Sequence, residues 1–165
     1  MDLNSSSISK PTLEIDTQDL PFRVIEEEIF IPLKDGAKLA ARLWRPETSG
    51  KYPAILEYIP YRKRDGTRLR DEEQHGYLAG HGYVCARVDM RGSGDSEGIQ
   101  LDEYLPIEQQ DGLEVIDWLA SQPWSTGSVG MFGLSWGGIT TLQLASHQPS
   151  ALKTIIPVGA SVDRY

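Results

Sequence analysis

Short apolar stretches, separated by polar and glycine-rich turns, run along most of the chain. Near the start, FRVIEEEIFIPL and KLAARLW have the mixed apolar and polar character of strands, and Lys34-Asp35-Gly36 between them is typical of a hairpin turn. Further on, AILEYI, YVCARVDM, SVGMF and KTIIPV are short apolar runs of the kind that forms buried strands. The pattern therefore predicts six strands, near residues 23–31, 38–44, 54–59, 83–89, 128–132 and 154–158.

Helical patterns fall between the later strands. A short helix is expected around EEQHGYLAG, and ITTLQLASH predicts another. Between them PIEQQDGLEVIDWLASQ predicts an amphipathic helix, because Leu113, Ile116 and Leu119 recur at helical spacing. A hairpin followed by alternating strands and helices predicts an α/β fold with a mainly parallel sheet.

We find no internal repeat and no linker in the sequence. We therefore expect a flexible polar segment over residues 1–20 and one folded unit over residues 21–165. The sequence MDLNSSSISKPTLEIDTQDL lacks an apolar core long enough for a secretory signal, and no window of the chain is long enough to span a bilayer. These features favour a cytoplasmic protein without a membrane partner.

The segment Gly133-Leu134-Ser135-Trp136-Gly137 fits the pattern G-x-S-x-G between a predicted strand and a predicted helix. In this nucleophile elbow the chain turns so sharply that the serine adopts strained backbone angles, and glycines are needed because a Cβ atom would collide with neighbouring backbone. Such a serine can be part of a plain loop, but the flanking strand and helix favour a nucleophile. Ser135 is therefore the candidate nucleophile, beside a helix N-terminus that can stabilise an oxyanion.

Charge and composition exclude several other classes. The net charge of −8 argues against a nucleic-acid partner, and we interpret the basic run YRKRDGTRLR as a solvated loop. The only cysteine, Cys85, lies in an apolar run and is expected to be a buried thiol. Gly92-Ser93-Gly94 resembles part of a dinucleotide fingerprint, but Glu97 stands where the third glycine belongs, so we do not predict nucleotide binding.

Several stretches together resemble the CocE/NonD family of α/β-hydrolases, which includes cocaine esterases, X-prolyl dipeptidyl-peptidases and α-amino-acid ester hydrolases. The stretches that carry the resemblance are IPLKDGAKLAARLWRP, YIPYRK, HGYVCARVDMRGSGDSEG, DGLEVIDWLASQPWSTGSVGMFGLSWGG and LKTIIP. The resemblance implies an eight-stranded hydrolase sheet with a helical cap inserted late and, usually, a following β-sandwich. With this fold we expect the six strands present here in the spatial order 1-2-4-3-5-6. This chain would be its N-terminal part, truncated after about six strands, without cap or sandwich.

The resemblance also implies roles for particular residues. Ser135 would be the nucleophile, and the backbone N–H of Trp136 would donate to the oxyanion. Pro60-Tyr61 matches the motif whose tyrosine hydroxyl is the second oxyanion donor. Tyr61 also follows an apolar strand, which places its ring at the edge where the serine emerges, although an aromatic packing residue would occupy the same position. Tyr58 belongs inside the strand and is not a candidate.

A base for this serine is not evident. His147 lies twelve residues along the helix that starts at the serine, roughly 18 Å away at 1.5 Å per residue. His75 and His81 precede a strand and are expected on the preceding helix or at the opposite edge of the sheet. Asp163 is a weak candidate for the triad acid, and we favour a structural or pocket role for it. Asp89 and Asp95 are interpreted as turn and hydrogen-bonding residues.

Two classes of function stay open from the sequence. The first is a serine hydrolase that cleaves a small ester or a short, X-prolyl peptide through an acyl-enzyme on Ser135. The second is a catalytically inert fragment or binding module that lacks the triad histidine. Neither implies a metal or an organic cofactor, because three scattered histidines and one cysteine form no ligand cluster. The last strand is expected to be an exposed edge that promotes self-association.

Overall fold

The computed structural model describes residues 20–162, so the predicted flexible segment lies almost wholly outside the described residues. This part of the chain forms six strands and three helices, and the helices alternate with the strands from the third strand onward. In chain order they are β1 (Val24–Pro32), β2 (Lys38–Pro46), β3 (Tyr52–Ile59), α1 (Arg68–Gly80), β4 (Val84–Asp89), α2 (Pro106–Ser121), β5 (Ser125–Leu134), α3 (Trp136–Ser146) and β6 (Leu152–Val158).

The strands form one curled sheet in the order β1-β2-β4-β3-β5-β6. Strands β1 and β2 form an antiparallel hairpin around Gly36, whose positive φ of 94° suits glycine. The pairs β3–β4, β3–β5 and β5–β6 are parallel, while β2 joins β4 antiparallel. The predicted strands and their spatial order are confirmed.

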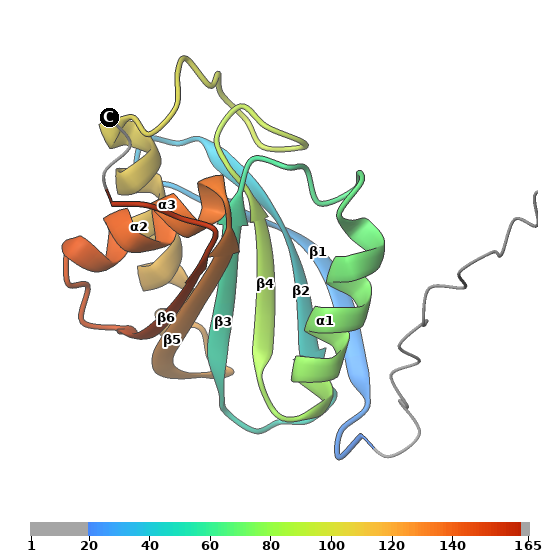
Figure 1. Cartoon of the computed structure of the whole chain (residues 1–165). Coiled ribbons are helices and arrows are strands. Elements are labelled where there is room, and N and C mark those ends of the chain that lie inside the picture. Colours follow the sequence, from blue (N-terminus) through green and yellow to red (C-terminus); the bar gives the residue numbers. More distant parts are fainter. Residues whose placement is uncertain (1–19, 163–165) are drawn as a thin grey trace, which may run out of the picture.

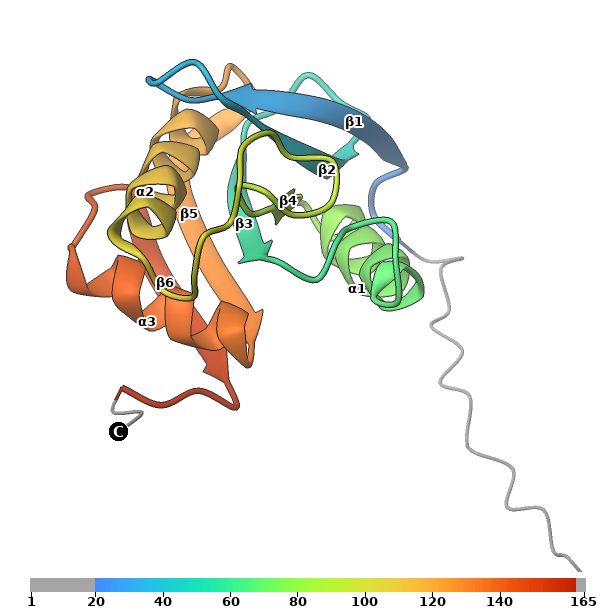
Figure 2. The same ribbon diagram turned by 90° about the horizontal axis from the view of Figure 1, so that it is seen from above.

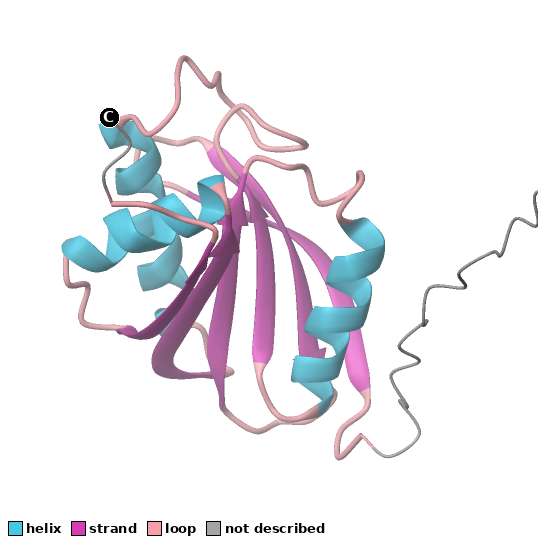
Figure 3. Cartoon of the chain, viewed as in Figure 1, coloured by secondary structure: helices cyan, strands magenta, loops and turns pink. Residues whose placement is uncertain are grey.

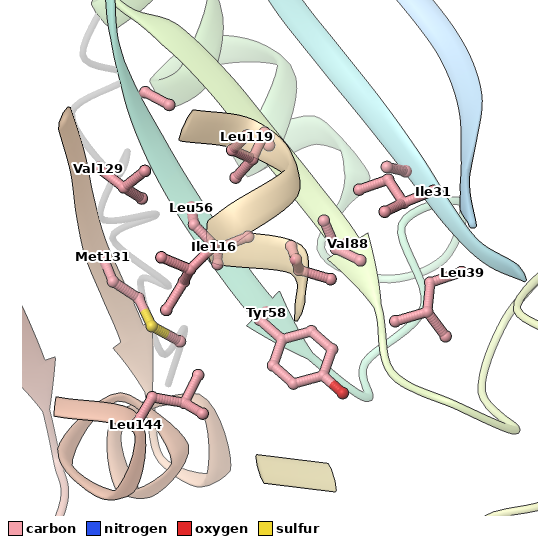
Figure 4. Packing of buried hydrophobic residues seen from close by; sticks show 14 of the residues in the cluster. Ile31, Leu39, Leu56, Tyr58, Val88, Ile116, Leu119, Val129, Met131 and Leu144 are labelled. Carbon is pink, nitrogen blue, oxygen red and sulfur yellow. The ribbon is translucent and has the colours of Figure 1, made fainter. Parts of the chain in front are cut away.

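Helices cover the sheet on both faces. Figure 1 shows α1 on one side of the sheet and α2 with α3 on the other, and Figure 2 shows the same arrangement from above. The main core lies under α2 and α3, where Ile116 and Leu119 of α2 pack against Leu56 of β3 and Met131 of β5 (Figure 4). Helix α2 begins at Pro106 as predicted, whereas Leu113, expected on its buried face, is only partly buried.

Charged side chains fill much of the space under α1. Glu57 of β3 and Arg87 of β4 stand opposite each other in the parallel register, and both are fully buried. The Arg87 Nε atom lies 2.9 Å from Asp71 Oδ2 of α1, and Arg70 Nη2 lies 2.7 Å from Glu57 Oε1. His75 Nε2 lies 3.2 Å from Glu57 Oε2. Helix α1 is therefore attached to the sheet by ion pairs as well as by apolar contacts.

The prediction that YRKRDGTRLR is a solvated loop is wrong in two places. Lys63 is 2% exposed because its ammonium group lies between the carboxylates of Asp95 and Glu28. Arg70 lies within α1, which starts earlier than predicted, and its guanidinium reaches the buried Glu57 carboxylate. Acidic partners contributed by distant strands and loops explain both differences, since a buried charge is tolerated only when it is paired.

The carboxyl ends of β3, β4, β5 and β6 meet at one edge of the sheet, and loops gather above it (Figure 3). On the outer side of β6, no further strand pairs with it among residues 20–162. Ile156 and Val158 of this strand are 60% and 46% exposed. An unpaired parallel edge with exposed apolar side chains is a template for pairing with another chain.

We predict that the isolated 165-residue polypeptide self-associates through β6. Ile156→Lys should shift it toward the monomer, because a charged side chain on an edge strand disfavours edge-to-edge pairing. Sedimentation velocity over a range of concentrations measures this. Ile99→Lys, at a 76% exposed loop position, is the matched control. A stable monomer at high concentration, or equal effects of the two substitutions, would contradict the prediction.

Candidate active site

Ser135 occupies the turn between β5 and α3 with φ 57° and ψ −114°, a strained conformation for a residue other than glycine. Its backbone N–H donates to the carbonyl of Val158 at 2.8 Å, and its carbonyl accepts from Ile139 N–H at 3.0 Å as the first helical bond. The residue is exposed, and its side chain makes no capping bond to the helix. The Ser135 hydroxyl therefore stands at the carboxyl edge of the sheet.

Glycines make this turn sterically possible. A Cβ atom at Gly133 would lie 2.3 Å from the backbone carbonyl of Gly137. A Cβ atom at Gly137 would lie 2.1 Å from Cγ2 of Ile59, and one at Gly138 would lie 2.8 Å from the carbonyl oxygen of Val158. The predicted collision with backbone is thus confirmed at Gly133, while at Gly137 the obstacle is the Ile59 side chain.

Tyr61 and Trp136 meet although they are 75 residues apart in the sequence. The backbone N–H of Trp136 donates to the Tyr61 hydroxyl oxygen at 3.2 Å. This N–H belongs to the first turn of α3, where backbone donors have no partner within the helix. Tyr61 is half-buried in the loop after β3, whereas Tyr58 is fully buried within the strand and donates to the Glu108 carbonyl at 3.3 Å. The structure thus brings together the two residues that the sequence singled out beside Ser135.

The loop that carries Tyr61 is fastened to the loop after β4. Arg62 adopts a positive φ of 59°, and the N–H of Lys63 donates to Asp89 Oδ1 at 2.7 Å. The other oxygen of Asp89 accepts from Asp95 N–H at 3.2 Å. Burial raises the pKa of Asp89, and these two N–H donors and nearby cations oppose that rise. The hydrogen-bonding role expected for Asp89 and Asp95 is confirmed.

Glu108, near the start of α2, is a residue that the sequence analysis missed. It is buried, and its Oε1 accepts from the indole Nε1–H of Trp136 at 2.9 Å and from the Thr140 hydroxyl at 2.8 Å. Its Oε2 accepts from Tyr104 N–H at 3.1 Å. A sequence signal existed, because Glu at the third position of a helix that opens with Pro is typical of an N-terminal capping arrangement.

The three histidines lie away from Ser135, as predicted. His147 caps the far end of α3 and bonds to Gln109 Oε1 at 2.8 Å through Nε2. His75 is buried under α1, where it stacks on Trp44 at a centroid distance of 4.8 Å. His81 ends the same helix, opposite the edge that carries the serine. Asp163, the weak candidate for a triad acid, lies outside the described residues.

Glu57, Asp71 and His75 place ligand-type atoms within 4.8 Å of one another. This cluster does not suit a metal ion, because Arg87 and Arg70 already pair with both carboxylates and would repel a cation.

Cys85 is a buried thiol whose pKa is raised well above its ordinary value by burial. Among residues 20–162, no helix is long and apolar enough to cross a membrane.

The curled, mainly parallel sheet and its sharp strand-to-helix turn at a serine define an α/β-hydrolase fold. A CocE/NonD family hydrolase from Staphylococcus aureus superposes with a TM-score of 0.72 at 30% identity, over 81% of this chain and 27% of that one. An α-amino acid ester hydrolase gives a TM-score of 0.64 at 26% identity, over 95% of this chain and 28% of that one.

Residues 35–165 match the family X-Pro dipeptidyl-peptidase (S15 family), and the chain belongs to this family. It is 33% identical to cocaine esterase from Rhodococcus sp. (strain MB1 Bresler), over 86% of this chain and 24% of that protein. A putative Xaa-Pro dipeptidyl-peptidase from Bacillus anthracis is 29% identical over 97% of this chain and 32% of its own length. The chain thus spans about a quarter to a third of these relatives.

The turn at Ser135 should not tolerate a side chain at Gly133. We predict that Gly133→Ala destabilises the fold by about 3 kcal/mol or more, because the backbone of Gly137 cannot move aside without distorting the start of α3. Gly66→Ala is the matched control, since a Cβ atom there meets nothing within 4 Å. Thermal unfolding of the two variants measures the difference, and equal midpoints would contradict the close approach described above.

A second prediction concerns acid stability. The hydrogen bond from the Lys63 ammonium lowers the pKa of Asp95, with a further contribution from the Lys63 charge, while partial burial opposes it. A carboxyl group whose pKa is lower in the folded state adds stability above its unfolded pKa, and this stability is lost as the pH falls through the folded pKa. Arg64 also pairs with Asp95, at 3.0 Å, and stays in place. Lys63→Met should therefore raise the Asp95 pKa part of the way toward its ordinary value and remove the part of the acid dependence that Lys63 causes.

Carbon-detected NMR titration of the Asp95 carboxyl group measures the pKa directly, and unfolding curves at neutral pH and at about pH 3 measure the stability. Lys51→Met, at an exposed position, is the control and should leave both unchanged. An Asp95 pKa that does not rise in the Lys63 variant would show that this ion pair does not set it.

Proposed function

We propose that this sequence supplies the nucleophile and the oxyanion hole of a serine hydrolase that cleaves ester or amide bonds through an acyl-enzyme on Ser135. The observation that carries the proposal is the contact between the Tyr61 hydroxyl and the Trp136 N–H, next to the exposed serine. Both groups are hydrogen-bond donors when an anionic oxygen is present, and they already lie 3.2 Å apart. A carbonyl oxygen bound between them would replace their mutual bond and accept from both.

The reaction follows from this placement. The Ser135 oxygen attacks the carbonyl carbon, the carbonyl π electrons move to its oxygen, and the Tyr61 hydroxyl and Trp136 N–H stabilise the resulting anion. A general base takes the serine proton and passes it to the leaving alcohol or amine as the tetrahedral intermediate collapses to the acyl-enzyme. Water then attacks the acyl group by the same sequence and releases the acid.

The base is proposed to come from outside residues 20–162. His75 is enclosed under α1, and His147 lies roughly 18 Å along α3 from the serine. General-base transfer needs hydrogen-bond reach of about 3 Å, which neither of these histidines satisfies. The acid that orients the base is assigned outside the same range, and Asp163 remains the candidate from this sequence.

The names of the relatives indicate the substrate class. They include cocaine esterase and putative Xaa-Pro dipeptidyl-peptidases, so we propose a small ester or a short X-prolyl peptide as substrate. The alternative is an inert fragment or binding module. The observation that supports this alternative is that all three histidines lie away from Ser135. A fluorophosphonate probe separates the two: Ser135 in the active hydrolase should label rapidly, and a binding module should not label.

We predict that Tyr61→Phe lowers kcat in the hydrolase that contains this sequence. Loss of one oxyanion donor typically costs about 100- to 1000-fold, and KM should change little because the hydroxyl acts on charge that appears in the transition state. Ser135→Ala should cost far more, because it removes the covalent route. Steady-state kinetics on an aryl ester and an X-prolyl anilide measure both effects and indicate which bond is preferred.

Tyr52→Phe is the control, since Tyr52 lies at the opposite end of β3, where its hydroxyl bonds to Thr48. If Tyr61→Phe leaves kcat within a few-fold of the parent enzyme, Tyr61 is a packing residue. Strong fluorophosphonate labelling of Ser135 in the isolated 165-residue polypeptide would contradict the proposal that the base lies outside the described residues.

A further inference from the structure

We propose that Glu108 is a positioning residue that holds Trp136, and through it the oxyanion-binding N–H, in place. The inference rests on the proposed function, because it assigns Glu108 to the same site. Trp136 is held at two points by two different partners. Its backbone N–H donates to Tyr61 and its indole N–H donates to Glu108, so neither end of the residue is free to rotate.

Glu108 contacts a second side chain of α3, that of Thr140, in addition to Trp136. The Thr140 hydroxyl lies 2.8 Å from Glu108 Oε1 and 3.0 Å from the Trp136 carbonyl oxygen, so it links the carboxylate to the helix backbone. The Tyr104 ring packs on the Trp136 ring at a centroid distance of 5.1 Å, and the Tyr104 N–H donates to Glu108 Oε2. Glu108 thus joins the start of α2, the preceding loop and the start of α3 around one indole.

Burying the Glu108 carboxylate costs free energy of folding. Glu108 is 7% exposed, and among the described residues no Lys, Arg or His nitrogen lies within 4.0 Å of its oxygens. A buried carboxylate without a cation lowers stability unless hydrogen bonds compensate it. Both oxygens of Glu108 are used by N–H groups, which can only donate, and the partial positive end of α3 lies beside them.

Through Glu108, α2 would set the position of the Trp136 N–H. An oxyanion donor must lie at the correct distance before the reaction starts, because reorganisation during the reaction would cancel its benefit. A misplacement of about 1 Å can cost on the order of 100-fold in rate. Releasing the indole would let the Trp136 peptide tilt, which weakens one of the two donors without removing it.

Glu108→Gln tests the proposal in the hydrolase that contains this sequence. The amide is the same size, but its NH₂ group faces a donor in either orientation. It therefore loses the bond to Trp136, or it loses the bond to Tyr104 and keeps the bond to Trp136 only through a neutral, weaker acceptor. We expect kcat to fall by about 10- to 100-fold, less than the full loss of a donor, with KM nearly unchanged. Single-turnover acylation and deacylation should slow together, because both steps form an oxyanion.

Glu114→Gln is the matched control. Glu114 lies on the same helix, and its carboxylate also accepts a distant backbone N–H, that of Lys34 at 2.8 Å. This contact is made to the hairpin turn between β1 and β2 and not to α3 or Tyr104. The control substitution should leave kcat within about two-fold of the parent enzyme, and it should lower the unfolding midpoint less than Glu108→Gln does, because the amide oxygen can still accept the exposed Lys34 N–H.

Trp136→Phe removes the indole N–H from the other side of the same bond. It should lower kcat by a comparable factor, and adding Glu108→Gln should then have little further effect, because the two residues act through one contact. This variant also keeps the test decisive if Glu108→Gln does not fold. In addition, the indole N–H resonance of Trp136 should shift upfield and exchange faster in Glu108→Gln.

The outcomes separate this inference from the proposed function. If Ser135→Ala keeps full turnover, the proposed function itself fails. If turnover depends on Ser135 but Glu108→Gln behaves like Glu114→Gln, with lower thermal stability and normal kcat, then Glu108 is only a structural residue and the inference is wrong. Additive effects of Glu108→Gln and Trp136→Phe would also overturn it.

Discussion

The close approach of the start of α3 to the ends of β3 and β5 is the constraint on which the rest of the site depends. Three glycines permit it, and Ser135 is forced to φ 57° at its centre. A serine that precedes a helix ordinarily caps it by accepting a backbone N–H with its hydroxyl. Here the strained backbone directs the side chain away and no capping bond forms. Steric crowding therefore leaves the Ser135 hydroxyl without a capping bond, while the first N–H of the helix, that of Trp136, donates to the Tyr61 hydroxyl.

The opposite face of the sheet is held by a different kind of interaction. Two carboxylates and two guanidinium groups meet under α1, and their formal charges balance. Replacing such a cluster with apolar residues often preserves stability, so its presence indicates a gain in orientation more than in energy. Ion pairs from Arg70 and Asp71 tie α1 to Glu57 of β3 and Arg87 of β4. The attached helix in turn fixes where the loop that carries Tyr61 ends.

Much of this architecture was predictable because it depends on local pattern. The six strands and the turn at Ser135 follow from short apolar runs and glycine positions, the strand order follows from the family resemblance, and the structure agrees. The buried roles of Lys63 and Glu108 were not predictable in this way, because their partners come from distant segments. Glu57 and Arg87 did leave a signal, as charges inside apolar strands that a parallel register places side by side. Residue identity alone does not tell which charges a fold will enclose.

Two buried carboxylates support the candidate oxyanion pair from different sides. Asp89 accepts the N–H of Lys63, just after Tyr61, while Glu108 accepts the indole N–H of Trp136. Each carboxylate has N–H donors on both of its oxygens. Moving Lys63 away from Asp89, or Trp136 away from Glu108, would take an N–H donor from a buried carboxylate oxygen. This costs about 1–3 kcal/mol, or more for a charged group. The loop that carries Tyr61 and the side chain of Trp136 are therefore each held by a buried carboxylate, so the fold itself fixes the spacing of the two candidate donors.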